Sequence, residues 1–312
     1  MIEVNNLVKR YGSKVAVDHI SFRIDDGEVV GFLGPNGAGK STAMNVLTGY
    51  ISSTDGCVKI DGYDVLENPL EVKRRIGYLP ENPPLYMDMT VNEYLEFACS
   101  IKGVGRPRRK HIDDICELVG IAHVRKRLIR NLSKGYKQRT GLAQALVGHP
   151  STIILDEPTV GLDPIQIIGV RNIIRELGNQ GTVILSSHIL PEVQSICKRV
   201  LVINEGKICA DGLIDELSSG AEENHKLQLR VAGAGDEVLR VLKGVVGVAD
   251  VRPLPSGEEG AQDYLVGGMD ETDLRGSVFA AVRDAGLILL SMKPTGLSLE
   301  ELFLKLTVKG EM

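Results

Sequence analysis

A glycine-rich segment at residues 34–41, Gly-Pro-Asn-Gly-Ala-Gly-Lys-Ser, constrains the fold of this 312-residue chain more than any other feature. It matches G-x-x-x-x-G-K-[ST] at every position, follows an apolar run at 29–33 and precedes a helical pattern at 39–49. Glycines let backbone N–H groups surround phosphate oxygens, and the helix N-terminus adds positive potential. The pattern predicts a nucleoside-triphosphate site in which Lys40 reaches the β- and γ-phosphates and Ser41 offers a hydroxyl to Mg²⁺. The predicted nucleotide-binding residues of this segment are Gly34, Pro35, Asn36, Gly37, Ala38, Gly39, Lys40, Ser41 and Thr42.

A second candidate site follows the apolar run at 152–155, which ends in Asp156 and Glu157. In an open α/β sheet, ligands bind at the carboxyl ends of the strands. Asp156 is predicted to help hold Mg²⁺, because this hard cation prefers oxygen ligands. Glu157, one residue further along, points elsewhere and is suited to polarise an attacking water. Up to this point kinases, GTPases and ATPases all remain open.

Short apolar runs alternate with helical patterns along the first two thirds of the chain, which predicts an α/β fold with a largely parallel sheet. Thr90 and Glu93 have the spacing of a capping box and predict a helix start. Asp163 followed by Pro164 predicts another. The predicted strands lie at 29–33, 57–60, 76–79, 152–155, 182–185 and 200–203.

Residues 218–224, Ser-Ser-Gly-Ala-Glu-Glu-Asn, have the composition of a linker, so we expect one domain at 1–218 and a second at 219–312. Strands at 226–231, 246–252, 262–266 and 287–292 with helices at 236–243 and 270–285 give the order βαββαβ. That order predicts a small ferredoxin-like α+β domain. A capping box from Ser298 to Glu301 predicts one more helix.

Composition narrows the function classes. The formal net charge is −5 and the pI about 5.8, which disfavours a protein that grips nucleic acid. The five cysteines include no CxxC pair, which suits free thiols in a reducing compartment. No apolar run approaches the roughly 18 residues of a membrane span, and the start has no secretory h-region. We therefore expect a cytosolic chain that reaches the membrane through a partner.

Four further segments point to one family. The stretch 131–139, Asn-Leu-Ser-Lys-Gly-Tyr-Lys-Gln-Arg, resembles the signature LSGGQ, and Gly-Leu-Asp at 161–163 resembles the D-loop. Ser-Ser-His at 186–188 resembles the switch histidine, and Tyr11 stands where an adenine-stacking aromatic is expected. With the phosphate loop and the acidic strand, these motifs occur in family order over residues 1–217. The chain resembles the nucleotide-binding domain of ATP-binding-cassette (ABC) transporters.

The resemblance implies a RecA-like core with an antiparallel β subdomain and a helical subdomain, and it implies ATP and Mg²⁺ as ligands. It further implies a head-to-tail homodimer in which Ser133 and Gly135 of one copy contact the ATP of the other. Asp163 of the D-loop is an implied nucleotide-binding residue. His188 would hydrogen-bond the γ-phosphate and orient Glu157. The implied partner is a transmembrane permease, which would hold the chain at the cytoplasmic face of the membrane. No nucleic acid is expected as a partner.

The chain departs from the family pattern at Lys134 and Tyr136 of the signature, and at Glu81, where the Q-loop glutamine is expected. Glu81 can still bind Mg²⁺ but adds negative charge beside the γ-phosphate. These departures and the ending at 299–307 are similar to ATPases paired with ABC-2-type exporters, including gliding-motility-associated ones. Three alternative functions are weighed against the transporter. An ABC protein that acts on ribosomes usually has two cassettes in one chain, and one that acts on DNA needs a long coiled-coil insertion. A kinase or GTPase would leave the signature segment and His188 unexplained.

Overall fold

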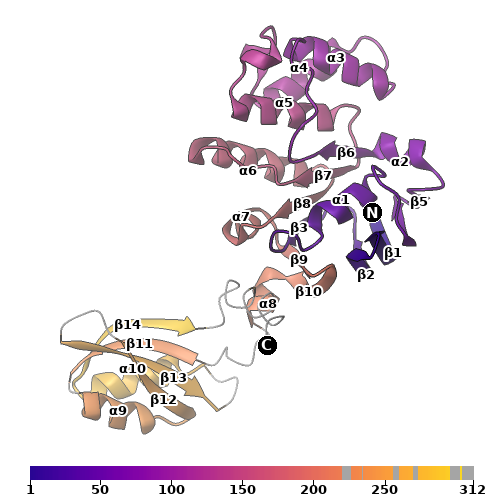
Figure 1. Ribbon diagram of the computed structural model, residues 1–312. Helices are drawn as coiled ribbons and strands as arrows, with labels where there is room; N and C mark the ends of the chain where they lie inside the picture. The colour runs from indigo at the N-terminus through magenta and orange to yellow at the C-terminus, as the bar shows by residue number, and fades with distance from the viewer. Residues whose placement is uncertain (220–225, 234, 256–259, 270–272, 296–302, 304–312) are drawn as a thin grey trace. The chain divides into compact units, whose positions relative to one another are not determined.

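The computed structural model describes residues 1–219, 226–233, 235–255, 260–269 and 273–295 together with Phe303 (Figure 1). The chain divides into two compact units, Met1–Ile214 and Asp215–Val308, each with its own hydrophobic core. Across the described ranges, no helix combines the length and the apolar character that crossing a membrane requires.

A six-stranded sheet in the order β10-β9-β3-β8-β7-β6 forms the centre of the first unit. The five strands from β9 to β6 run parallel, and β10 is antiparallel to β9. Every residue of β7 and β8 is buried, as expected for a parallel sheet covered on both faces. The predicted α/β fold is confirmed. The strands are β3 (Val29–Leu33), β6 (Ile76–Leu79), β7 (Thr152–Asp156), β8 (Thr182–Ser187), β9 (Arg199–Asn204) and β10 (Lys207–Leu213).

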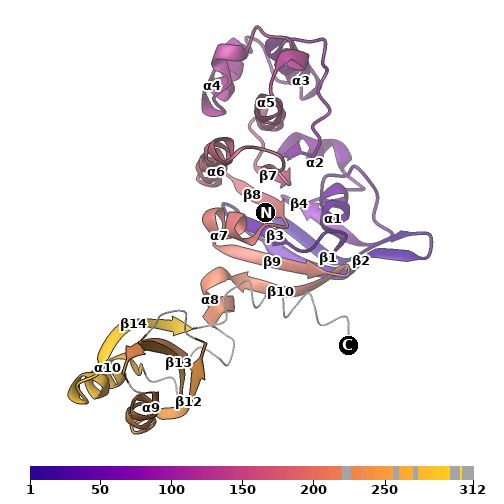
Figure 2. The same cartoon turned by 60° about the vertical axis from the view of Figure 1, so that its left-hand side comes forward.

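Helices α6 and α7 cover one face of this sheet, whereas α1 and a second, antiparallel sheet lie on the other (Figure 2). The antiparallel sheet has the order β2-β1-β4-β5. Its inner face shares a core with the central sheet, where the rings of Phe22 and Phe32 are 5.9 Å apart. The elements are β1 (Ile2–Tyr11), β2 (Lys14–Ile24), α1 (Lys40–Leu47), β4 (Asp55–Ile60), β5 (Tyr63–Asp64), α2 (Pro69–Arg75), α6 (Pro164–Gly178) and α7 (Leu190–Ile196).

A helical region between β6 and β7 contains α3 (Val91–Ile101), α4 (Arg109–Leu118) and α5 (Lys134–Leu146), with short 3₁₀ turns at Ala122–Val124 and Ile129–Asn131. The capping box predicted for α3 is confirmed, since Thr90 Oγ1 accepts from Glu93 N and the Glu93 carboxylate accepts from Thr90 N. Helix α5 packs closely on β6, because a Cβ on Gly77 would lie 2.1 Å from the Ala145 carbonyl oxygen. This contact fixes the signature segment relative to the sheet edge that precedes Glu81.

The second unit has the element order βαββαβ, with the antiparallel strand order β12-β13-β11-β14. Tyr264 is fully buried in its core. Within the described residues the predicted helix at 270–285 begins only at Arg275, while the predicted helix from Ser298 and the linker residues 220–224 lie outside them. The elements of this order are β11 (Lys226–Ala232), α9 (Gly235–Lys243), β12 (Val248–Leu254), β13 (Ala261–Gly268), α10 (Arg275–Asp284) and β14 (Ile288–Thr295), and α8 (Ile214–Ser219) precedes them in the chain.

Candidate functional site

The carboxyl ends of β3, β7 and β8 meet at a cavity of about 520 Å³. The β1–β2 hairpin and the segment after β6 complete its walls. The cavity brings together most of the residues predicted from the sequence, including the phosphate loop and both candidate catalytic side chains. Its lining residues are Tyr11, Lys14, Ala16, Asn36, Gly37, Gly39, Lys40, Ser41, Thr42, Glu81, Glu157, Val160 and His188.

The phosphate loop between β3 and α1 has the backbone that its glycines permit. Gly37 and Gly39 have φ values of +82° and +106°, in the left-handed region that disfavours other residues. A Cβ on Gly39 would also lie 2.4 Å from the Ala16 carbonyl oxygen. Helix α1 begins immediately afterwards at Lys40, so the free N–H groups of its first turn face the loop. This arrangement fits a bound phosphate.

The Lys40 ammonium lies inside the loop. Its Nζ donates to the carbonyl oxygens of Gly34, at 2.8 Å, and Pro35, at 3.1 Å, and the residue is only 6% exposed. Burial lowers the pKa of Lys40, and the negative charges of Glu157 and Asp156 act in the opposite direction. A buried cation held at this position can neutralise phosphate oxygens that enter the cavity.

Oxygen donors suited to Mg²⁺ lie beside the loop. Ser41 Oγ is 3.3 Å from Asp156 Oδ1, and the same carboxylate oxygen accepts from Ser186 Oγ. Glu81 lines the cavity as well. Mg²⁺ usually takes one or two protein carboxylates and leaves its other positions to phosphate oxygens and water, so these residues fit it. Mg²⁺ held by these oxygens would offset the negative charge of a bound phosphate group.

Glu157 and His188 form the other wall. His188 Nδ1 lies 2.9 Å from Glu157 Oε1 and 3.0 Å from Oε2. Glu157 is 6% exposed, and its φ of +49° places it in the left-handed region. Its backbone N–H donates to Ser186 Oγ at 3.0 Å, which anchors this strained residue to the end of β8. A carboxylate held in this way can accept a proton from a water molecule beside the phosphate.

Seven predicted site residues are not among those that line this cavity: Gly34, Pro35, Ala38, Asp156, Ser133, Gly135 and Asp163. The first three belong to the phosphate loop, and Asp156 contacts Ser41 of that loop. Ser133, Gly135 and Asp163 belong to other elements. Ser133 caps α5 and accepts from Tyr136 N at 3.5 Å. Asp163 caps α6 and accepts from Gln166 N at 2.9 Å. Within one chain, Ser133, Gly135 and Asp163 are therefore not part of the cavity that contains Lys40 and Glu157.

Sequence reasoning missed Lys14, Ala16 and Val160 among the lining residues. Lys14 pairs with Tyr11 across the β1–β2 hairpin, so the short turn between two apolar runs was the available signal. The Tyr11 ring is 51% exposed, and Lys9 Nζ lies 5.3 Å from its centre. A half-exposed aromatic ring at the wall of the cavity can stack on a planar base.

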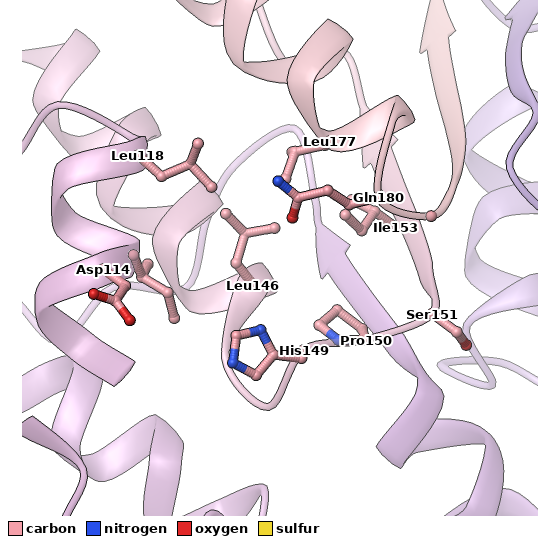
Figure 3. Close-up of a pocket in the computed structure, with 11 residues that line it drawn as sticks. Asp114, Leu118, Leu146, His149, Pro150, Ser151, Ile153, Leu177 and Gln180 are labelled. Carbon is pink, nitrogen blue, oxygen red and sulfur yellow. The ribbon is translucent and has the colours of Figure 1, made fainter. Parts of the chain in front are cut away.

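Another hollow, of about 460 Å³, lies between α4, the end of α5 and the end of α6 (Figure 3). Leu118, Leu146 and Leu177 supply apolar lining, and Asp114 and Gln180 add polar side chains. None of the predicted site residues lines it. The nucleotide chemistry therefore belongs to the cavity at the strand ends.

Known proteins identify the family of this site. The chain is 39% identical over 231 residues to the bacitracin transport ATP-binding protein BcrA of Bacillus licheniformis, covering 73% of this chain and 75% of that protein. The chain belongs to the ABC transporter ATP-binding proteins. The family model described as "ABC transporter" matches residues 17–160 of this ABC protein.

A second relative extends the similarity of this ABC protein through both units. The linearmycin resistance ATP-binding protein LnrL of Bacillus subtilis is 32% identical over 309 residues, which is 98% of each chain. Among solved structures, the ATP binding subunit of an ABC transporter superposes with a TM-score of 0.65 at 28% identity, covering 70% of this chain and 92% of that one. As an ABC transporter ATP-binding subunit, the chain binds ATP and is an ATPase.

Proposed function

We propose that two copies of this chain hold two MgATP between them, head to tail, and that closure and hydrolysis drive a separate ABC-2-type membrane permease. One observation carries the proposal. Ser133 and Gly135, at the N-terminus of α5, do not line the cavity that contains Lys40 and Glu157. A helix N-terminus with free N–H groups suits a phosphate, and a second copy can bring it to the triphosphate.

The residues of the cavity then take separate roles. Tyr11 stacks on adenine, residues 34–42 hold the phosphates, and Ser41, Asp156 and Glu81 contribute oxygens for Mg²⁺. Glu157 accepts the proton of the attacking water. His188 orients Glu157 and hydrogen-bonds the γ-phosphate. Asp163, which caps α6, approaches the ATP of the other copy.

Exposed apolar side chains support a dimer contact on this side of the chain. Ile165 and Ile168 in the first turns of α6 are 82% and 58% exposed, and Ile189, directly after His188, is 39% exposed. Isoleucines exposed beside two motif residues are typical of a surface that another protein covers. Closure of the dimer would bury them and exclude water from the triphosphate.

A third cavity, of about 610 Å³, supports a permease contact. It lies between α1, α2 and α3, and its exposed apolar residues Tyr50, Leu70 and Ile101 are 77%, 73% and 70% exposed. Pro84, three residues beyond Glu81, lines it too. An amphipathic helix of the permease fits this groove, so a movement of the Glu81 segment would reach the membrane partner.

The proposed location is the cytoplasmic face of the membrane, through that permease. Assignment to the ABC-2-type exporter group rests on the resemblance at Glu81, Lys134 and Tyr136. The proposed domain boundary lies at 218/219, and we assign the domain 219–312 the role of supporting the dimer. Co-purification of an ABC-2-type permease with the chain from membranes tests the exporter assignment.

A trapped dimer tests the proposal. Glu157→Gln should elute as a dimer with saturating MgATP and as a monomer without it, as measured by light scattering after gel filtration. Adding Ser133→Arg should keep MgATP binding but abolish the dimer. Thr90→Arg is the matched control, because it also replaces a helix N-cap residue but on α3, and it should leave the dimer intact. A monomer at saturating MgATP would refute the sandwich.

A further inference from the structure

A buried carboxylate, that of Glu192, lies outside the proposed site and is held by several polar contacts. Glu192, in α7, is 2% exposed and lines none of the cavities described above. Its Oε2 accepts from Thr159 Oγ1 at 2.7 Å and from Ser187 Oγ at 3.2 Å. Its Oε1 lies 3.9 Å from Arg171 Nη2. Burying an ionised carboxylate is costly, so its hydrogen-bond partners compensate for lost hydration.

The two hydroxyl donors belong to the two segments that carry the proposed catalytic pair. Thr159 stands two residues after Glu157, and Ser187 stands immediately before His188. Both bond the same oxygen of Glu192. One carboxylate oxygen therefore joins the segment after β7 to the last residue of β8.

The contact also fixes the backbone around the histidine. Ser187 Oγ accepts from the N–H of Ile189 at 3.0 Å while its own proton goes to Glu192. The residues on both sides of His188 are thereby tied to one hydroxyl. A displacement of this hydroxyl would shift the imidazole relative to Glu157, which it contacts at 2.9 Å.

We propose that Glu192 is a positioning residue for ATP hydrolysis, which holds His188 against Glu157 through Ser187 and Thr159. The inference rests on the roles of Glu157 and His188 in the proposed function. Glu192 itself contacts neither nucleotide nor water in this scheme. Small losses of alignment between reacting groups reduce catalytic rates strongly, so loosening this tie lowers turnover without altering the phosphate loop that binds ATP.

Thr159→Val tests the tie, because it keeps the shape of the side chain and removes the donor. We expect kcat to fall about tenfold, as the loss of one hydrogen bond to a charged group predicts, with KM and the Kd for MgATP unchanged. Thr152→Val is the matched control. It also removes a buried threonine hydroxyl, but one that has no hydrogen-bond partner among the described residues, so kcat should stay the same.

A double-mutant cycle distinguishes positioning from a general structural effect. If Glu192 acts through His188, Thr159→Val should lower kcat in the wild-type background and have no further effect in His188→Ala. Two losses that multiply would overturn the inference. Glu192→Gln keeps an acceptor for Thr159 and should retain more activity than Glu192→Ala at equal MgATP affinity, and equal kcat for these two variants would also count against it.

The single variants separate this inference from the function beneath it. Glu157→Gln or His188→Ala with full hydrolysis would remove the proposed roles of the catalytic pair. A reduced but measurable kcat in both, together with multiplying effects in the cycle, would remove only the role of Glu192. Thr159→Val carries the test if the glutamate variants do not fold.

Discussion

His188 Nδ1 lies 2.9 Å from Glu157 Oε1, although the two residues follow different strands of the central sheet. Parallel pairing sets this contact, because Asp156 and Ser186 are register partners on β7 and β8. Each strand is followed by one functional side chain, so the strand register places the imidazole against the carboxylate. The pair occupies the wall of the cavity that faces Lys40, whose Nζ is 3.7 Å from Glu157 Oε1.

This pairing predicts that Glu157→Gln lowers kcat by about a hundredfold or more, because an amide cannot accept the proton of the attacking water. ATP affinity should change little, since Lys40 and the loop remain. Steady-state hydrolysis and equilibrium ATP binding measure the two quantities. The control is Glu205→Gln, which changes another glutamate at positive φ, 48°, but at an exposed position outside the cavity. Comparable loss in both variants would contradict a chemical role for Glu157.

Replacing Glu81 with glutamine should change the affinities for ATP and for Mg²⁺ in opposite directions. This substitution removes a negative charge from the cavity that contains Lys40, so ATP should bind about threefold more tightly in the absence of Mg²⁺. The Mg²⁺ concentration for half-maximal hydrolysis should rise, because one oxygen ligand loses its charge. Titrations of ATP in chelator and of Mg²⁺ at fixed ATP measure these changes. Glu67→Gln, an exposed carboxylate outside the cavity, should leave both values unchanged.

The parts of the site that could be predicted from the sequence are those whose geometry is set by short local segments. The phosphate loop, the strand ending in Asp156 and the caps at Thr90 and Asp163 depend on neighbouring residues alone. Strand β1 follows no simple alternation, because Asn6 has a φ of +52° and the register shifts between Val4 and Leu7. Its place in the fold was predicted only through the family resemblance.

Tertiary contacts account for the features that sequence reasoning did not find. Lys14 enters the cavity because the hairpin folds over the phosphate loop, and Glu192 gains its partners only when β7, β8 and α7 pack together. No spacing in the chain links Glu192 to Thr159. Only the folded chain brings the Glu192 carboxylate to the Thr159 hydroxyl.

Two threonines at the starts of neighbouring strands differ in their hydrogen bonds, so replacing each with valine should change the stability in opposite directions. Thr152 on β7 and Thr182 on β8 are register partners, and both are buried. Thr182 Oγ1 accepts from Gly27 N at 3.1 Å and lies 3.4 Å from the Asp25 carbonyl oxygen, whereas Thr152 Oγ1 has no partner among the described residues. Thr152→Val should raise the free energy of unfolding by about 1 kcal/mol, and Thr182→Val should lower it by about as much. Urea unfolding followed by circular dichroism measures both, and equal shifts of one sign would show that hydrogen bonding does not decide them.

The carboxylate of Asp263 should make the stability of the second unit fall at acid pH. The Arg230 guanidinium holds the pKa of Asp263 below its ordinary value through two hydrogen bonds, between β11 and β13. Because the folded state favours the charged form, this pair stabilises the unit above the ordinary pKa of aspartate, and the contribution is lost as the pH falls through the lowered value. Asp263→Asn should therefore reduce stability at pH 6 and weaken its dependence on pH between 6 and 3.

Calorimetry at several pH values measures this effect through the unfolding transition of the second unit. Asp250→Asn is the matched control, because it removes an exposed carboxylate that pairs with Arg252 on the neighbouring strand β12. An exposed pair contributes little to stability, so the Asp250 variant should follow the wild-type pH profile. If Asp263→Asn and the wild type lose the same amount of stability on acidification, the pair with Arg230 is not what makes the unit sensitive to acid.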